Sequence, residues 1–115
     1  MGEPMARVYR SRTYKAWFAG LNKNEQRIVD TRIDKYRLQD QLLNTKSLDR
    51  SLGLWEFKWK SGLRVYFSLI EDSQGRLMLL LLGGNKNTQA IDIKEARKIV
   101  RDALKGIEKK GKTHE

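Results

Sequence analysis

The sequence predicts an α+β fold, with two N-terminal helices, a three-stranded antiparallel meander and a C-terminal helix. Large apolar and polar residues alternate along residues 55–60 and again along 63–68, which is typical of strands with one buried face. Apolar residues recur at helical spacing in two segments before residue 40 and in one segment after residue 92. The length of 115 residues fits a single domain, and we expect its folded core to cover residues 7–107.

The first helix is predicted from an apolar face that extends over two turns. Its members recur three and four residues apart: Tyr14, Trp17, Phe18 and Leu21. Ser11 or Thr13 can cap its N-terminus, and Gly20 lies near its end. Before this helix, residues 7–10 can form an extra edge strand, and residues 1–6 are expected to be a flexible lead-in.

The second helix is predicted to begin after a cap at Asn22 or Asn24 and to continue to about residue 40. Four apolar residues form its inward face: Ile28, Val29, Ile33 and Tyr36. Its outer face mixes charges of both signs, which is typical of a solvated helix surface: Arg27, Asp30, Arg32, Asp34, Lys35 and Arg37. Residues 41–52 show no clean period, so we predict a loop there.

The alternation in the first two strands separates two sets of side chains. One set is apolar and predicted to face the core: Trp55, Phe57, Trp59, Leu63, Val65 and Phe67. The other set is mostly polar: Glu56, Lys58, Lys60, Arg64, Tyr66 and Ser68. We expect this second face to be open to solvent, which makes it the candidate for function. Residues 77–82 are apolar on both faces, so the third strand should be the most buried.

The hairpin between the first two strands decides whether the polar set shares one face. A two-residue turn would pair Trp59 with Arg64 and bury an unpaired guanidinium, which is costly. We predict a three-residue loop or a bulge instead. Its pairs are Lys60 with Arg64 and Lys58 with Tyr66.

The C-terminal part is predicted from turn residues and one long apolar helix face. Residues 72–75 have hairpin-turn chemistry, and the glycine pair 83–84 is predicted to form a second turn. Asp92 and Glu95 match a capping box for the last helix. Its apolar face contains Ala96, Ile99, Val100, Ala103, Leu104 and Ile107. Residues 109–115 are expected to be a flexible basic tail.

The excess of basic residues indicates which kind of partner the protein binds. Lys and Arg number 24 against 14 Asp and Glu, and the net charge of +10 favours a polyanionic partner, an acidic protein, or both. The chain has no cysteine, which excludes disulfides and thiolate metal sites and fits a reducing compartment. No apolar run approaches the roughly 20 residues of a membrane span, so we expect a cytoplasmic protein without membrane contact.

Several kinds of chemistry lack the residues they need. The one histidine is His114, near the end of a polar tail, so a histidine triad or histidine-ligated metal is not expected. Residues 83–88 lack the glycine-lysine-hydroxyl order of a P-loop. The strands offer a single carboxylate, Glu56, on their polar face, so we expect no metal site and no cofactor.

The remaining groups suit RNA cleavage without a metal. That reaction needs a base for the 2′-hydroxyl, cations for the phosphate and a proton donor for the leaving 5′-oxygen. Glu56 or a lysine of lowered pKa can be the base, Arg64 can bind the phosphate, and Tyr66 can donate a proton or stack on a base. Four lysines would add positive potential: Lys46, Lys58, Lys60 and Lys86. Each residue also has a purely structural interpretation, as a solvated lysine, a cross-strand ion pair or half-buried packing.

Two stretches carry a resemblance to a known family. They read GLWEFKWKSGLRVYF from residue 53 and LMLLLLGGNKNTQAIDIKEARKI from residue 77. Over residues 8–100 the chain resembles the HigB-like addiction-module killer proteins of the RelE/ParE toxin superfamily. The resemblance implies a compact toxin with a curved antiparallel sheet, which cleaves mRNA in the ribosomal A site without metal. It also implies a cognate antitoxin that holds the toxin inactive, with DNA contact through the antitoxin complex alone.

The resemblance also implies roles for particular residues. Arg64 would be the phosphate-binding strand arginine, supported by Lys46, Lys60 and Lys86. The segment before Arg64 is shorter than in family members with a Gly-Pro-Gly turn, and no tyrosine follows Tyr66. Two alternatives therefore stay open beside the nuclease. One is a ParE-like toxin that inhibits DNA gyrase without cutting nucleic acid. The other is a degenerate or purely regulatory module that binds its antitoxin and can also bind an operator. The same fold serves all three.

Overall fold

The computed structural model describes residues 7–39 and 44–113 and confirms an α+β fold, with more strands than expected. Its elements in chain order are β1 Arg7–Arg10, α1 Arg12–Ala19, α2 Lys23–Gln39, β2 Thr45–Asp49, η1 Arg50–Leu52, β3 Leu54–Lys58, β4 Leu63–Asp72, β5 Gly75–Asn85, η2 Lys86–Thr88 and α3 Gln89–Thr113. The predicted lead-in at residues 1–6 and the lone histidine, His114, lie outside the described residues.

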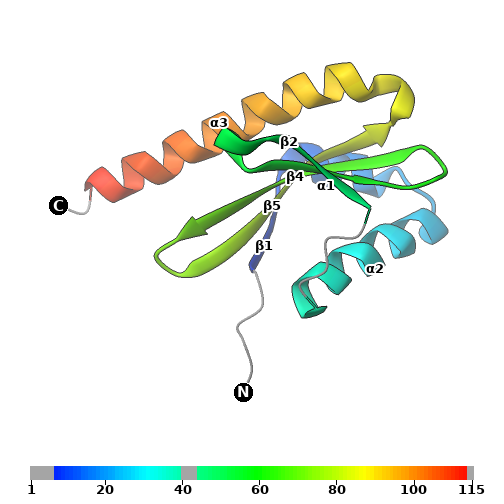
Figure 1. Ribbon diagram of the computed structural model, residues 1–115, viewed down its shortest axis with the longest axis horizontal. Coiled ribbons are helices and arrows are strands. Elements are labelled where there is room, and N and C mark those ends of the chain that lie inside the picture. The colour runs from blue at the N-terminus through cyan, green and yellow to red at the C-terminus, as the bar shows by residue number, and fades with distance from the viewer. Residues whose placement is uncertain (1–6, 40–43, 114–115) are drawn as a thin grey trace.

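The five strands form one sheet in the order β1-β5-β4-β3-β2 (Figure 1). β2, β3, β4 and β5 pair antiparallel in sequence order, which confirms the predicted meander and adds one strand to it. β1 pairs parallel with β5, so the predicted N-terminal edge strand exists. β5 lies between β1 and β4, and residues 78–83 within it are buried, as expected of the third meander strand.

The observed caps of α1 and α2, Ser11 and Asn22, are among the residues predicted for these positions. The Ser11 hydroxyl accepts a hydrogen bond from the Tyr14 amide at 3.0 Å. Asn22 and Glu25 form a reciprocal capping box, because each side chain accepts a hydrogen bond from the backbone amide of the other, at 2.8 and 3.2 Å. These caps fix where α1 and α2 begin relative to the sheet.

One face of the sheet packs against α1 and α2. Its buried residues form one apolar cluster: Tyr14, Val29, Ile33, Tyr36, Phe57, Leu63, Val65, Phe67, Met78 and Leu80. Gly83 belongs to this contact, since a Cβ at that position would overlap the indole ring of Trp17. The glycine pair 83–84 therefore lies inside β5 and lets a helix approach it, and the predicted turn there is wrong.

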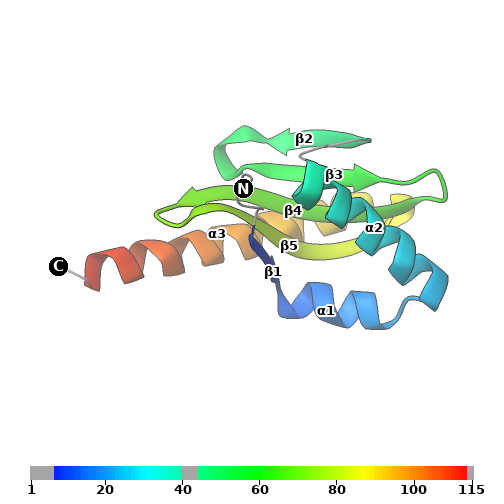
Figure 2. The same ribbon diagram turned by 90° about the horizontal axis from the view of Figure 1, so that it is seen from below.

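The opposite face of the sheet is covered by α3, as Figure 2 shows. A second buried cluster lies beneath the helix: Leu54, Tyr66, Leu79, Leu81, Leu82, Ala96 and Val100. The face that we expected to be open is thus closed over much of its area. Alternation along a strand identifies which side chains share a face, but it does not show that a distant helix returns to cover that face.

Three further predictions about the backbone need correction. Residues 45–49 form strand β2 rather than a loop, and Lys46 lies on it. Asn85, not Asp92, is the N-cap of the turn η2 that leads into α3, so the last helix begins earlier than expected. α3 continues as helix to Thr113, past the predicted start of the tail. No helix described in residues 7–39 and 44–113 combines the length and hydrophobicity needed to cross a membrane.

Candidate functional site

The β3–β4 hairpin places the predicted polar residues. The Trp59 amide donates to the Leu63 carbonyl at 3.1 Å, so a three-residue loop, Lys60-Ser61-Gly62, closes the hairpin. A three-residue loop was predicted, but at residues 61–63, one residue later than the observed loop. The observed pairs are Lys58 with Arg64 and Glu56 with Tyr66. Because this register differs from the predicted one by two residues, every side chain keeps its predicted face.

Glu56 is fully buried, which contradicts its expected place on an open face. Its Oε2 accepts a hydrogen bond of 2.7 Å from Nε2 of Gln89, in the first turn of α3. The same oxygen lies 3.7 Å from Nε of Arg64. Glu56 therefore ties the start of α3 to the strand that carries Arg64, and it has no direct access to a substrate.

Tyr66 is also fully buried and takes no part in the exposed surface that we predicted for it. Burial raises the pKa of its hydroxyl well above the usual value, and the carboxylate of Glu56 raises it further. The phenol thus stays protonated at neutral pH. Its position beneath α3 excludes a direct contact with RNA, either as a proton donor or as a stacking surface.

Arg64 is held at the boundary between the covered and open parts of the same face. Its side chain is 14% exposed, and its Nη1 donates to the carbonyl oxygens of Leu63 and Trp59 at 2.9 and 3.2 Å. These contacts, together with the carboxylate of Glu56, fix the direction of the guanidinium. Because Nη1 and Nε face protein groups, Nη2 is the nitrogen of this guanidinium that remains for a phosphate. A side chain that is already held in place loses less conformational entropy when an anion binds.

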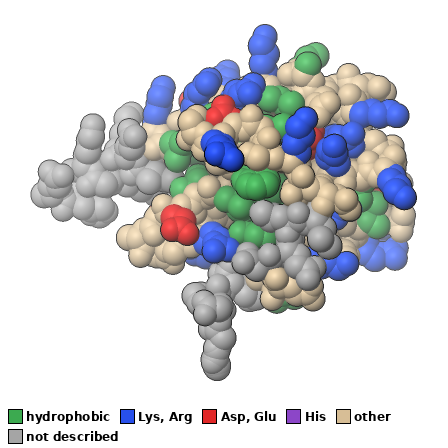
Figure 3. Space-filling view, viewed as in Figure 1, with side chains coloured by type: hydrophobic (Ala, Val, Ile, Leu, Met, Phe, Trp, Pro, Cys, Tyr) green, Lys and Arg blue, Asp and Glu red, His purple; other side chains and the backbone are tan. Residues whose placement is uncertain are grey.

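A surface hollow of about 490 Å³ opens beside Arg64. Its lining residues come from α2, the start of β2, and the β3–β4 hairpin: Arg32, Asn44, Lys58, Trp59, Lys60 and Arg64. We call it the hairpin hollow. Four of these six residues are cations and none is an acid, so the hollow concentrates positive potential. Figure 3 shows Lys and Arg side chains along the upper and right-hand margins of one face, with few acids between them.

The other two predicted lysines lie outside the lining of the hairpin hollow. Lys46 is exposed on β2, directly opposite Glu56 in the strand pairing. Lys86 is exposed in η2, and its aliphatic chain lies about a van der Waals contact from the Cβ position of Gly62. The structure therefore brings Lys58, Lys60 and Arg64 together and places Lys46 and Lys86 around them.

Three residues of the hollow were not predicted from the sequence as site residues: Arg32, Asn44 and Trp59. Arg32 was assigned to the solvated outer face of α2, yet its guanidinium stacks over the ring of Trp59, 4.3 Å from the centroid. Trp59 was assigned to the core, yet it is half-buried and lines the hollow. One signal was available: Arg32 lies one helical turn after Ile28, at the edge of the inward face.

Comparison with known proteins adds one finding about the fold. No protein-family model and no curated protein sequence matches the chain. Among solved structures, it is similar to a chain of the toxin–antitoxin complex RelBE2 from Mycobacterium tuberculosis, with a TM-score of 0.50 and 16% identity. The alignment covers 70% of this chain and 98% of that chain. The chain thus has a fold like that of a protein in the RelBE2 toxin–antitoxin complex.

Proposed function

We propose that the protein is the toxin of a toxin–antitoxin pair, and that it cuts messenger RNA on the ribosome without a metal ion. The observation that carries this proposal is the hairpin hollow, where Arg64, Lys58 and Lys60 converge with no acid among the lining residues. The sequence resemblance to the RelE/ParE superfamily and the similarity of fold support it. The proposal includes a cytoplasmic location and a cognate antitoxin as partner.

Arg64 is the central residue of the proposed reaction. The scissile phosphate would bind in the hairpin hollow, and the 2′-oxygen of the preceding ribose would attack the phosphorus while the 5′-oxygen leaves. Negative charge grows on the phosphate oxygens in this step, and a preorganised guanidinium stabilises that charge without having to reorient. Lys58 and Lys60, both exposed at the rim, add to the stabilisation.

Glu56 and Tyr66 have no direct part in the proposed reaction, because both side chains are fully buried. Glu56 is a positioning residue that orients Arg64 through the ion pair of 3.7 Å. The base that accepts the 2′-hydroxyl proton must then come from the exposed groups. Lys58 and Lys60 are the candidates that line the hollow.

The test is to express the protein in bacterial cells and to map the 5′ ends of cellular messages. Attack by the 2′-oxygen leaves a 5′-hydroxyl end and a 2′,3′-cyclic phosphate, so new 5′-hydroxyl ends within codons are expected. Arg64→Ala should abolish both the cuts and the growth arrest. Lys15→Ala, which removes an exposed cation from α1, should leave both unchanged.

Folding of the Arg64 variant needs its own control, because removal of one partner leaves the buried carboxylate of Glu56 without its cation. Arg64→Lys keeps the charge and removes the planar fork, so it should fold and still lose most of the cuts. Full toxicity of a folded Arg64→Ala protein would refute the assignment.

A second candidate function is favoured by the burial of Glu56 and Tyr66. With both enclosed, the hairpin hollow is lined by cations but has no carboxylate or phenol for proton transfer. A ParE-like toxin that inhibits DNA gyrase would need no such groups. Growth arrest with intact messages and a DNA-damage response would support this function and exclude the nuclease.

A further inference from the structure

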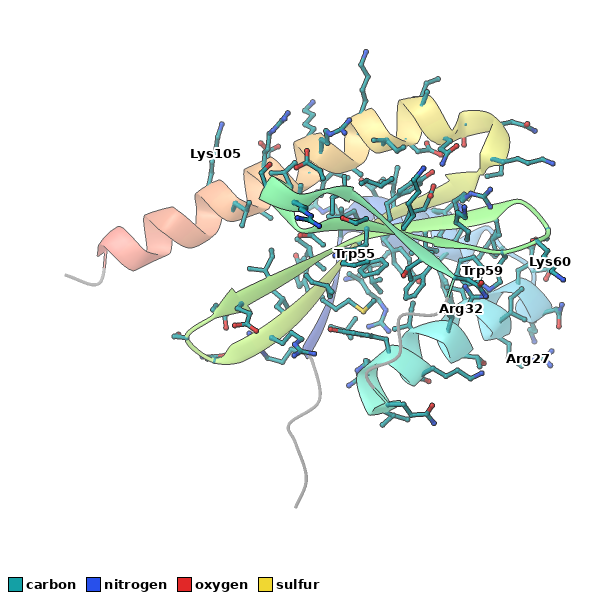
Figure 4. The ribbon with its side chains drawn as sticks, viewed as in Figure 1. Arg27, Arg32, Trp55, Trp59, Lys60 and Lys105 are labelled. Atoms are coloured by element: carbon teal, nitrogen blue, oxygen red, sulfur yellow. The ribbon has the colours of Figure 1, made fainter. Side chains whose placement is uncertain are left out.

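A second hollow shares Trp59 with the hairpin hollow and is lined mainly by residues of α2. Its volume is about 360 Å³, and it is lined by Arg27, Ile28, Thr31, Arg32, Lys35 and Trp59. Trp59 and Arg32 line both this hollow and the hairpin hollow. Figure 4 shows Arg27, Arg32, Trp59 and Lys60 at the same end of the molecule. The two hollows therefore meet at one aromatic residue and form a basic strip around it.

Arg32 is in an unusual environment for a cation. It stacks on Trp59, its Nη1 donates 3.0 Å to the carbonyl oxygen of Lys58, and burial lowers its pKa. Among the described residues it has no carboxylate partner, and neither hollow has an acid in its lining. A partly desolvated cation without a counter-charge is stabilised when an anion binds beside it.

The acids on α2 do not supply that counter-charge. Asp34 lies 3.8 Å from Arg37. Burial raises the pKa of Asp30, and the charge of Arg10, at the end of β1, acts against that rise. Glu25 lines a different hollow, beside Trp17 and the glycines of β5. The strip is thus lined by cations without an acid, and Trp59 belongs to both of its hollows.

We propose that this strip binds single-stranded RNA, with an unpaired base stacked against the Trp59–Arg32 pair and the neighbouring phosphates held by Arg27 and Lys35. The inference deepens the proposed function, because it extends the substrate path from Arg64 across Trp59 to α2. Only an unpaired base exposes a ring face for stacking, and a cationic groove with an aromatic platform is the usual means of holding a single strand. Duplexes do not offer that face.

The experiment uses the purified full-length protein and a short, dye-labelled 2′-O-methyl RNA, which cannot be cut because it lacks the 2′-hydroxyl. Fluorescence anisotropy gives the dissociation constant at several salt concentrations. Trp59→Leu should weaken binding about tenfold or more, and Trp59→Phe should restore most of the affinity. Lys15→Ala serves as the control, because it removes an exposed cation of α1 that lines neither hollow.

Two further measurements separate stacking from charge and from misfolding. Inorganic polyphosphate has charge but no bases, so Trp59→Leu should bind it as well as the wild-type protein does. Arg27→Ala and Lys35→Ala remove exposed cations, and each should reduce the slope of log affinity against log salt by about 1. A labelled single-stranded DNA of the same sequence, as a further arm, shows whether the sugar matters, and tighter binding of DNA than of RNA would overturn the RNA assignment.

Two results would overturn the proposed stacking on Trp59. Unchanged RNA affinity in Trp59→Leu would exclude base stacking, and an equal loss for RNA and polyphosphate would assign the effect to charge or folding. These readouts do not depend on cleavage. RNA binding through Trp59 with no cuts in cells would leave the inference standing and refute the nuclease, whereas cuts with unaltered Trp59→Leu binding would refute the inference alone.

Discussion

The sheet face under α1 and α2 is packed with aliphatic and aromatic side chains, whereas the face under α3 also buries the carboxylate of Glu56. On the first face, Phe57 and Phe67 stack with ring centroids 4.5 Å apart, in a continuous apolar cluster. On the second, leucines and valine fill the middle, but Glu56 and Tyr66 are buried near the start of α3.

This difference indicates that the two faces contribute differently, one to stability and the other to the orientation of Arg64. Apolar contacts on the α1–α2 face supply free energy of folding, because burial there removes hydrocarbon from water. The buried polar cluster on the α3 face contributes little net stability, since desolvation offsets its ion pair. Its contribution is geometric: it directs Arg64 toward the hairpin hollow. Mutations on the two faces should therefore separate stability from activity.

The largest loss of stability is expected from Phe57→Ala. The side chain is fully buried and stacked on Phe67, so its removal should lower the free energy of unfolding by about 3–5 kcal/mol. Urea denaturation of the purified protein measures this. Ile91→Ala, at a side chain that is 72% exposed, should change stability by no more than about 0.5 kcal/mol. Equal losses in the two variants would contradict the proposed core.

Gly83→Ala should be the next most damaging change. A methyl group there meets the indole of Trp17, and overpacking of this kind costs about 1–3 kcal/mol. Gly106→Ala is the matched control, because open space surrounds that position within α3, and alanine should stabilise the helix by up to about 1 kcal/mol. If Gly83→Ala melted with the wild-type protein, α1 would not lie against β5 as described.

Glu56→Gln should affect activity far more than stability. The amide oxygen can still accept the hydrogen bond from Gln89, but the ion pair with Arg64 is lost. The guanidinium of Arg64 loses its carboxylate, but it is 14% exposed and keeps two carbonyl hydrogen bonds. Stability should therefore fall by about 1 kcal/mol, less than the roughly 3–5 kcal/mol expected when a fully buried charge is left unpaired. A misdirected guanidinium should reduce message cleavage about tenfold to a hundredfold. Urea denaturation measures the free energy of unfolding, and counting 5′-hydroxyl ends measures message cleavage. A variant that cuts normally would show that Glu56 does not position Arg64.

The smallest effect concerns the edge of the sheet and depends on pH. Nη2 of Arg7 lies 2.6 Å from Oδ1 of Asp72, and this hydrogen bond, with that from the Gln74 amide, lowers the pKa of Asp72 in the folded protein. A lowered folded pKa contributes stability above the unfolded value of about 3.9, and the contribution disappears as the pH falls through the folded value. Asp72→Asn should therefore melt slightly below the wild-type protein at pH 7.

The difference between Asp72→Asn and the wild-type protein should vanish in acid. Thermal melts at pH 7 and below pH 3 measure it, with the exposed neighbour Glu71→Gln as the control, which should melt with the wild-type protein at pH 7. A melting difference that persisted unchanged in strong acid would show that Asp72 contributes through something other than its charge.

Local patterns predicted the elements well where one physical signal dominated. Period-2 alternation located β3 and β4 and assigned each side chain to its face, and capping chemistry located the starts of α1 and α2. The N-terminal strand was also predicted. These features depend on neighbours in the sequence, so the sequence alone can show them.

The errors arose where distant segments meet. The burial of Glu56 and Tyr66 depends on α3, which returns over the sheet from more than twenty residues away in the sequence. Gly83 and Gly84 were predicted to form a turn, since a glycine pair is typical of turns. Their actual role is to leave room for Trp17 and Asp92, and the sequence pattern does not show those contacts. The hollow around Trp59 likewise depends on how α2 lies beside the hairpin. Periodicity carries no information about such contacts.

The most direct test of the central claim compares 5′-hydroxyl ends in messages from cells that express the wild-type protein, Arg64→Lys or Lys15→Ala at equal levels. We predict abundant cuts within codons for the wild-type protein and Lys15→Ala, and few for a folded Arg64→Lys protein. Wild-type levels of cutting by Arg64→Lys would contradict the claim that a fixed guanidinium at the hairpin hollow performs the reaction.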